Sequence, residues 1–214
     1  MYLNLCISFS NRKLQNFKQS QNKHAKKLIC YTYSLFVSDF MNNLCKYSGS
    51  GVLVIDIATD NVLLVYDYSG NYNCCGGFLK YNFDDPQFLE KTAQEELYEE
   101  TRMLINCNLD ELAACPFIDL PLYEDIFRCY ILKIRCQTDI CEQFEKTVID
   151  EKTFDEDYFE TTALAFFSIE QFRNRESMEI IEQTFQGLAH DGTKCNLNKR
   201  AIAAIKTAIQ SNLL

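Results

Sequence analysis

The amino-acid sequence predicts an α/β protein in which a mixed β-sheet is sandwiched between helices. Two β-rich runs flank a turn at Asp60-Asn61, an apolar stripe with helical spacing follows, and further strands alternate with helices. A chain of 214 residues with 47% hydrophobic and 13% aromatic residues can bury one sizeable core and still carry an extension. We therefore expect one domain over residues 46–214, preceded by an extension over residues 1–45.

The domain is expected to begin with a β-hairpin. Residues 51–57 read G-V-L-V-I-D-I, residues 62–66 return as V-L-L-V-Y, and Asp60-Asn61 supplies the turn. Asp84-Asp85-Pro86 then predicts the start of a helix, with an Asp as its cap and Pro86 in its first turn. This helix is expected to run to about Met103.

The later part of the domain continues the alternation of strands and helices. Apolar runs predict three more strands, the last of which leads through Ser168 into a short helix, and a stripe of isoleucines predicts a helix near the C-terminus. The strands are Phe117–Leu120, Ile126–Arg135 and Ala163–Phe167, and the stripe is Ile202, Ile205 and Ile209. The acid-rich stretch Thr138–Glu160 is expected to be a solvated loop or insertion.

Charge is distributed unevenly along the chain, whose net charge is -9. Residues 1–49 hold seven Lys or Arg and one Asp, a net charge of +6, so the remaining 14 basic and 29 acidic residues carry -15. The basic N-terminal arm either contacts a polyanion or is a solvated tail.

Cysteine and histidine usage argues against zinc and against a disulfide framework. The 11 cysteines are scattered without a C-x-x-C pair, and the two histidines are His24 and His190. Most cysteines are therefore expected to be small buried hydrophobes in a reducing compartment. Residues 1–11 lack a basic region before their apolar residues, and the uncharged run 28–38 is too short to span a bilayer. We expect a cytoplasmic protein without a membrane partner.

The helix after Pro86 carries a cluster of carboxylates beside its apolar stripe. On a helical wheel with Glu96 at zero, Glu99 lies at about 300° and Glu100 at about 40°, so the three acids share an arc of about 100° at the edge of the core. Such like charges repel unless a cation lies between them. The pattern is consistent with either an acidic surface or a site for Mg²⁺ or Mn²⁺, which prefer oxygen ligands.

The surroundings of these acids resemble the Nudix hydrolase family. The family's motif reads Gly, five residues, Glu, seven residues and then Arg-Glu-U-x-Glu-Glu-x-Gly-U, where U is aliphatic. The flanks are also similar to the family, from the hairpin after Lys46 to the strand and helix that end at Arg173. The matching motif positions are Gly77, Glu96, Leu97, Glu99, Glu100 and Met103.

The motif also departs from the family pattern. The segment from Gly77 to Glu96 is longer, so a bulge is expected at 80–85, and Gln87 stands where the family has its first Glu. Glu95 replaces the motif Arg and is expected to face solvent, where Lys91 can pair with it. Arg102 replaces the Gly, which predicts a helix end without a glycine-type conformation.

The resemblance implies a Nudix-type α/β/α sandwich and a metal-dependent hydrolase that cleaves a phosphoanhydride bond. Glu96, Glu99, Glu100 and the main-chain carbonyl of Gly77 would hold Mg²⁺ or Mn²⁺, and the three glutamates are the candidate catalytic residues. The general base is Glu99, Glu100 or a downstream acid such as Glu160. Candidate phosphate contacts are Lys80, Arg128, Lys133 and Arg135, although an ordinary surface charge is the favoured interpretation of each.

Several substrates agree with this resemblance. They are a nucleoside diphosphate derivative, an RNA cap and a diphosphoinositol polyphosphate, and the basic arm favours a polyanion. The alternative is a catalytically weakened Nudix-fold module that binds a nucleotide or a protein partner, because the motif Arg and first Glu are replaced. An RNA-binding arm is less favoured, since Phe17 stands alone among the lysines.

Overall fold

The computed structural model describes residues 46–122, 125–147, 156–173, 179–181 and 184–214. The chain divides into two compact units, residues 1–46 with 83–86 and residues 47–82 with 87–214. In the first unit, residues 83–86 form a turn. The second unit contains all the strands and helices described below, and the basic arm over residues 1–45 lies outside the described residues.

Among the described residues of the second unit, ten strands form one mixed sheet. They are β1 (Tyr47–Asp56), β2 (Asn61–Asp67), β3 (Tyr72–Asn73), β4 (Cys75–Phe78), β5 (Phe117–Leu122), β6 (Asp125–Ile134), β7 (Thr161–Ser168), β8 (Glu179–Ile181), β9 (Thr184–Leu188) and β10 (Lys194–Leu197). The order is β5-β6-β1-β2-β3-β10-β9-β8, with β4 paired to β1 and β7 paired to β2. The β1–β6 and β3–β10 pairs are parallel, and the other pairs are antiparallel.

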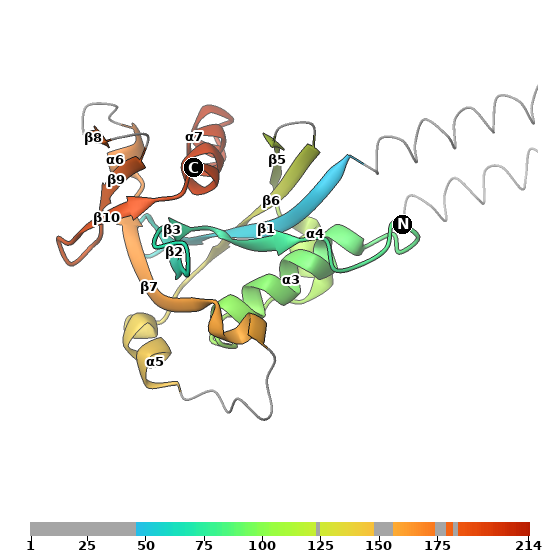
Figure 1. Ribbon diagram of the computed structural model, residues 1–214, viewed down its shortest axis with the longest axis horizontal. Coiled ribbons are helices and arrows are strands. Elements are labelled where there is room, and N and C mark those ends of the chain that lie inside the picture. Colours follow the sequence, from blue (N-terminus) through green and yellow to red (C-terminus); the bar gives the residue numbers. More distant parts are fainter. Residues whose placement is uncertain (1–45, 123–124, 148–155, 174–178, 182–183) are drawn as a thin grey trace, which may run out of the picture. The chain divides into compact units, whose positions relative to one another are not determined.

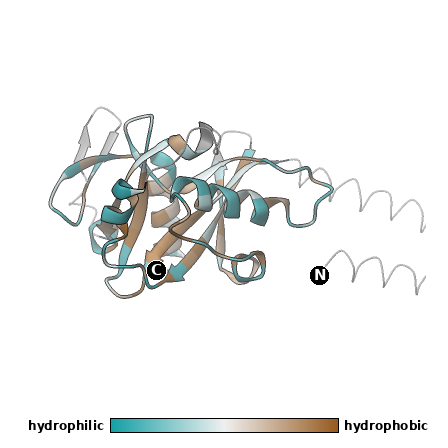
Figure 2. Ribbon diagram, turned by 90° about the horizontal axis from the view of Figure 1, so that it is seen from below, coloured by the Kyte–Doolittle hydropathy of each residue, from teal (hydrophilic) through white to brown (hydrophobic). Residues whose placement is uncertain are grey.

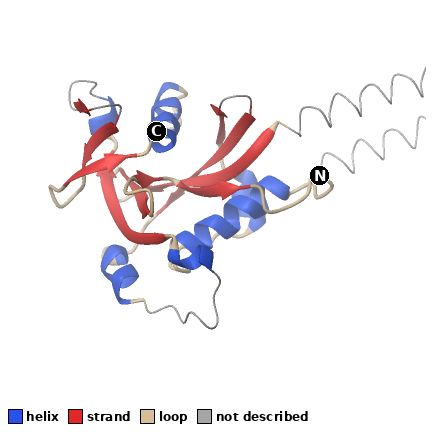
Figure 3. Ribbon diagram, viewed as in Figure 1, coloured by secondary structure: helices blue, strands red, loops and turns tan. Residues whose placement is uncertain are grey.

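Helices cover both faces of this sheet (Figure 1; Figure 3). They are α3 (Phe88–Glu100), α4 (Leu109–Ala114), α5 (Ile140–Lys146), the 3₁₀ helix η1 (Glu156–Phe159), α6 (Glu170–Arg173) and α7 (Lys199–Gln210). Helix α3 packs on β1 and β4, whereas α7 packs on β1, β3 and β5 from the opposite side. The result is an α/β/α sandwich, which confirms the predicted fold class.

The alternation of side chains along β1 divides the core into two layers, because successive residues of a strand point to opposite faces. Val52 and Val54 pack with Leu97 of α3 in one hydrophobic cluster. Leu53 packs with Ile205 of α7 in the other. Hydrophobic residues accordingly dominate the central strands, and the helices carry hydrophilic bands (Figure 2). Both faces of β1 are therefore buried, which explains its continuous apolar sequence.

Each strand expected from the sequence is present, but the boundaries of the central helix were predicted wrongly. The hairpin is formed by β1 and β2, whose turn includes Asp60 with a φ of 54°. Helix α3 begins at Phe88 rather than at Pro86, and its N-cap residue Gln87 makes no side-chain capping hydrogen bond. It ends at Glu100 rather than near Met103, because the backbone reverses at the next residues.

Some helices and strands were not predicted from the sequence. The acid-rich stretch Thr138–Glu160 contains α5, whose Ile140 and Phe144 are buried; residues 148–155 of the stretch lie outside the described residues. Helix α4 begins with a capping box, in which Asn108 and Glu111 exchange side-chain and backbone hydrogen bonds. Strands β3, β8, β9 and β10 were also not predicted.

Two further observations concern the described residues only. Their eight cysteines are free thiols, of which Cys74, Cys75, Cys107 and Cys129 are buried and the others are half-buried. Within the same residues, no helix has both the length and the hydrophobicity needed to cross a bilayer.

Arg102 fastens the end of α3 to two other elements. Its φ of 50° lies in the left-handed region, which corrects the expectation of a non-glycine conformation at this position. Its guanidinium donates hydrogen bonds to the carbonyls of Phe144, Thr147 and Thr161, and it lies 4.0 Å from the centre of the Phe144 ring. These contacts offset the backbone strain, so an arginine occupies a position that favours glycine.

Substitutions of Arg102 separate the backbone strain from the side-chain contacts. We expect Arg102→Ala and Arg102→Gly both to lower the free energy of unfolding by about 1–3 kcal/mol through the lost charged hydrogen bonds. The glycine variant should be the more stable of the two by about 0.5–1 kcal/mol, because it relieves the left-handed strain. Chemical denaturation measures both, with Arg173→Ala as a surface control; equal stabilities for the two Arg102 variants would contradict the assignment.

Candidate metal centre

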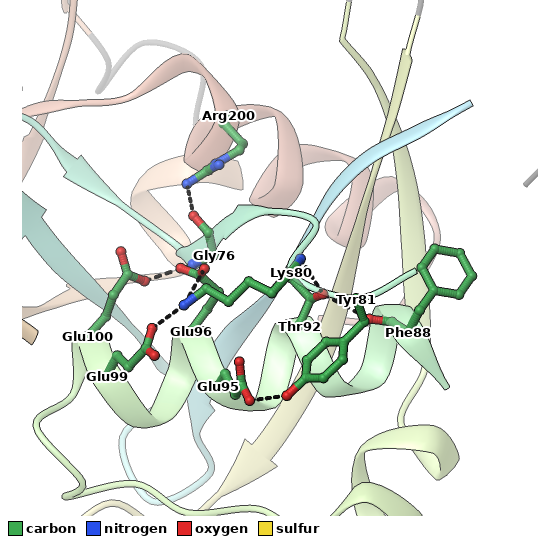
Figure 4. Close-up of polar contacts among 10 residues, drawn as sticks. All are labelled: Gly76, Lys80, Tyr81, Phe88, Thr92, Glu95, Glu96, Glu99, Glu100 and Arg200. Atoms are coloured by element: carbon green, nitrogen blue, oxygen red, sulfur yellow. Dashed lines mark hydrogen bonds and ion pairs between the residues drawn. The ribbon is translucent and has the colours of Figure 1, made fainter. Parts of the chain in front are cut away.

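The edge of the sheet at β4 and one turn of α3 form the candidate site (Figure 4). Strand β4 pairs with the first half of β1, and α3 packs across both strands. This packing places the Glu96 carboxylate directly over Gly77. A Cβ atom added to Gly77 would lie 2.5 Å from Glu96 Oε1 and 2.7 Å from Glu96 Oε2. The carboxylate of Glu96 thus occupies the space that a side chain at position 77 would take.

Glu100 attaches α3 to the neighbouring residue of the glycine pair. The backbone N–H of Gly76 donates a hydrogen bond of 2.7 Å to Glu100 Oε2. Gly76 has a φ of 148°, and a Cβ atom there would lie 2.7 Å from the Cα atom of Gly51 and 2.8 Å from the carbonyl oxygen of Ser50. The φ and the close approach of β1 both favour a glycine at Gly76, whereas the space beside Gly77 is taken by Glu96 of α3.

Arg200 contacts the same glycine from the other face of the sheet. Its guanidinium donates a hydrogen bond of 2.6 Å to the Gly76 carbonyl oxygen and one of 3.3 Å to Asn73 Oδ1. It also lies 4.6 Å from the centre of the Phe127 ring. Asn198 caps α7 by accepting a hydrogen bond from the Arg200 backbone N–H, which sets the direction of the arginine. The carbonyl and N–H of Gly76 are thus both fixed by charged side chains.

Lys80 lies between the carboxylates of α3. Its ammonium is 3.2 Å from Glu96 Oε1 and also donates a short hydrogen bond to Glu99 Oε2. The side chains are 25% exposed for Lys80, 11% for Glu96 and 15% for Glu99, so this is not an ordinary surface ion pair. The Lys80 backbone N–H donates to Thr92 Oγ1, and the side chain extends from there along α3 (Figure 4).

Burial governs the protonation of the site. It raises the pKa of Glu96 to about 7, although the Lys80 ammonium opposes this shift. Burial also raises the pKa of Glu100 well above its usual value; the charge of Glu96 adds to the increase, and Arg200 opposes it. Burial lowers the pKa of Lys80, but its contacts with Glu99 and Glu96 outweigh burial and leave the pKa above its ordinary value. The carboxylates therefore need more positive charge nearby to remain ionised.

Other predicted positions take different roles. Glu95 is half-buried and accepts a hydrogen bond from the Tyr81 hydroxyl, so the expectation that it faces solvent was wrong. Arg128 is paired with Asp119 and stacked 3.9 Å from the centre of the Phe117 ring. Lys133 and Arg135 are exposed on or just after β6, and Glu160 follows η1, which packs against α3. Arg128 is therefore a structural cation rather than an ordinary surface charge.

Two residues of the site, Arg200 and Tyr81, were not singled out from the sequence. Arg200 and Lys199 are basic residues in the first turn of α7, where the helix dipole favours acids. This mismatch was a signal that the arginine has a specific partner. Tyr81 lies in the loop between β4 and α3 and carried no comparable signal.

The donor atoms at this site are oxygens. Within the described part of the chain, no three His, Cys, Asp or Glu side chains converge into a preformed metal cage. Glu96 and Glu99 nevertheless share one cation, the Lys80 ammonium, and Glu96 lies against the Gly77 backbone. Carboxylate and carbonyl oxygens suit Mg²⁺ or Mn²⁺ better than a soft metal.

No protein-family model and no curated protein matches the chain. Among solved structures, it is similar to a MutT/nudix family protein from Enterococcus faecalis, with a TM-score of 0.40 and 13% identity over 93% of this chain and 74% of that chain. A Bacillus subtilis pyrophosphohydrolase gives a TM-score of 0.36 and 15% identity, covering 78% of each chain.

A bifunctional NMN adenylyltransferase/ADP ribose pyrophosphatase from Francisella tularensis, complexed with AMP and a manganese ion, is also similar. Its TM-score is 0.34 and its identity 16%, over 74% of this chain and 44% of that chain. The present chain thus spans less than half the length of the Francisella protein.

The two glycines predict different responses to the same substitution. We expect Gly76→Ala to lower the free energy of unfolding by about 2 kcal/mol or more, because its Cβ atom meets backbone and its φ is strained. Gly77→Ala should cost less than about 1 kcal/mol, because only the end of the Glu96 side chain must move. Chemical denaturation of both variants tests this order. A larger loss for Gly77→Ala than for Gly76→Ala would contradict this difference between the two glycines.

Proposed function

We propose that this protein is a metal-dependent hydrolase that cleaves a phosphoanhydride bond. The substrate class is a nucleoside diphosphate derivative or a related polyphosphate, such as an RNA cap or a diphosphoinositol polyphosphate. The observation that supports the proposal is the placement of Glu96 and Glu99 around one cation beside the Gly76-Gly77 pair. The resemblance of the motif around these residues to the Nudix hydrolases gives the reaction type.

Each residue of the site has a proposed role in this reaction. Glu96, Glu99 and the carbonyl of Gly77 would hold Mg²⁺ or Mn²⁺, with Glu100 completing the set of acids. The bound ion would neutralise phosphate oxygens and make water a better nucleophile. Glu100 holds the Gly76 N–H and thereby fixes α3 to the strand that carries Gly77. The general base is taken to be Glu99, Glu100 or Glu160.

A second function has its own supporting observation. Lys80 already neutralises Glu96 and Glu99, and Glu95 and Gln87 stand where the family has Arg and Glu. These features favour a weakened Nudix-fold module that binds a nucleotide or a protein partner without turnover. The two functions differ in whether product is released.

Hydrolysis of a substrate panel tests the proposal. With Mg²⁺ or Mn²⁺, the purified protein should release phosphate-containing products from a nucleoside diphosphate derivative, a capped RNA or an inositol pyrophosphate. Glu99→Gln and Glu100→Gln should lower kcat/KM by about 100-fold or more, since even outer partners of a metal site are worth about 10- to 100-fold. Both variants should remain folded by circular dichroism.

The control for this experiment is Glu145→Gln, which changes an exposed acid of α5 and should leave turnover unchanged. Binding of a nucleotide without turnover of any compound in the panel would support the module instead. Full activity of Glu99→Gln and Glu100→Gln would remove the carboxylates from the mechanism.

A further inference from the structure

Lys80 has contacts that an ordinary surface lysine does not need. Its ammonium touches Glu96 and Glu99, two of the carboxylates assigned to the metal, and the Lys80 side chain is only 25% exposed. The backbone at Lys80 is tied to Thr92, a fully buried residue of α3 that also donates from its hydroxyl to the Phe88 carbonyl. The start of the lysine side chain is therefore held on the helix that carries the acids.

The charges explain why a cation is held there. Glu96 and Glu100 are both buried on neighbouring turns of one helix, where two charged carboxylates repel one another. Arg200 reaches the Gly76 carbonyl from the opposite face of the sheet and makes its hydrogen bonds there. Among the described contacts of Glu96 and Glu99, the ammonium of Lys80 supplies the positive charge on the α3 side.

A divalent ion and the ammonium would use the same oxygens. Glu96 Oε1 and Glu99 Oε2 are the atoms that contact Lys80. Because charged hydrogen bonds to these oxygens must break before a metal takes them, the two cations exclude one another.

We propose that Lys80 is a resident counter-ion that Mg²⁺ or Mn²⁺ displaces, so that metal binding and release of the Lys80 ammonium are one coupled event. This inference rests on the metal site of the proposed function. The lysine weakens metal binding while keeping the carboxylates neutralised in the metal-free protein. The released ammonium stays tethered beside the site through the backbone of Lys80.

The first test measures Mn²⁺ binding by calorimetry with the full chain. Lys80→Met should bind Mn²⁺ about tenfold or more tightly than the wild type, because the charged hydrogen bonds no longer have to be broken. Lys146→Met removes the same charge from an exposed pair with Glu142 on α5 and should leave the affinity unchanged. Equal or weaker binding by Lys80→Met than by the wild type would overturn the inference.

A second measurement needs no variant, and so covers the case in which Lys80→Met fails to fold. Amine-reactive labelling followed by mass spectrometry reports the reactivity of each lysine in the wild-type protein. Saturation with Mg²⁺ should raise the labelling rate of Lys80 several-fold and leave that of Lys146 unchanged. An unchanged rate for Lys80 would overturn the inference.

The two hypotheses fail in different ways. If Glu96→Gln and Glu99→Gln bind Mn²⁺ as well as the wild type does, the metal site of the proposed function is wrong and the inference falls with it. If those variants lose Mn²⁺ but Lys80→Met gains no affinity, the metal site stands and only the counter-ion role of Lys80 is wrong.

Discussion

The packing of the Glu96 carboxylate on the bare backbone of Gly77 is the constraint on which the rest of the site depends. It brings a buried acid of α3 to the edge of the sheet, and Glu100 secures the same helix through the Gly76 N–H. A carboxylate in this position is desolvated, so its charge must be compensated. The burial of Glu96 against Gly77 explains why the Lys80 ammonium lies beside this carboxylate and why the site needs further positive charge.

The two faces of the sheet contribute differently to this arrangement. The α3 face supplies the acids, and the α7 face supplies Arg200, whose hydrogen bond to the Gly76 carbonyl fixes the peptide that leads into Gly77. The end of α3 is secured separately, because the guanidinium of Arg102 reaches α5 and β7. The helix is therefore held at its carboxylates and at its C-terminal end, which limits the movement of the acids.

Periodicity predicted the elements whose side chains alternate or repeat regularly. The hairpin, the strands β5, β6 and β7 and the helices α3 and α7 have such patterns. The boundaries of α3 were wrong because Pro86 and the position of Arg102 were interpreted from local preference, whereas tertiary contacts decide where the helix stops. The carboxylate helix was predicted from spacing, but the contact of Lys80 with Glu96 and Glu99 depends on how the loop folds back. No local pattern encodes that contact.

We propose that α3 and the glycine pair present a cation site at the sheet edge. The sharpest test is a crystal structure of the protein from crystals soaked in Mn²⁺, with anomalous data collected at the manganese edge. We expect one anomalous peak at about 2.1 Å from oxygens of Glu96 and Glu99, with the Lys80 ammonium moved away. A structure in which Lys80 still bridges the two carboxylates and no peak lies beside Gly77 would contradict it.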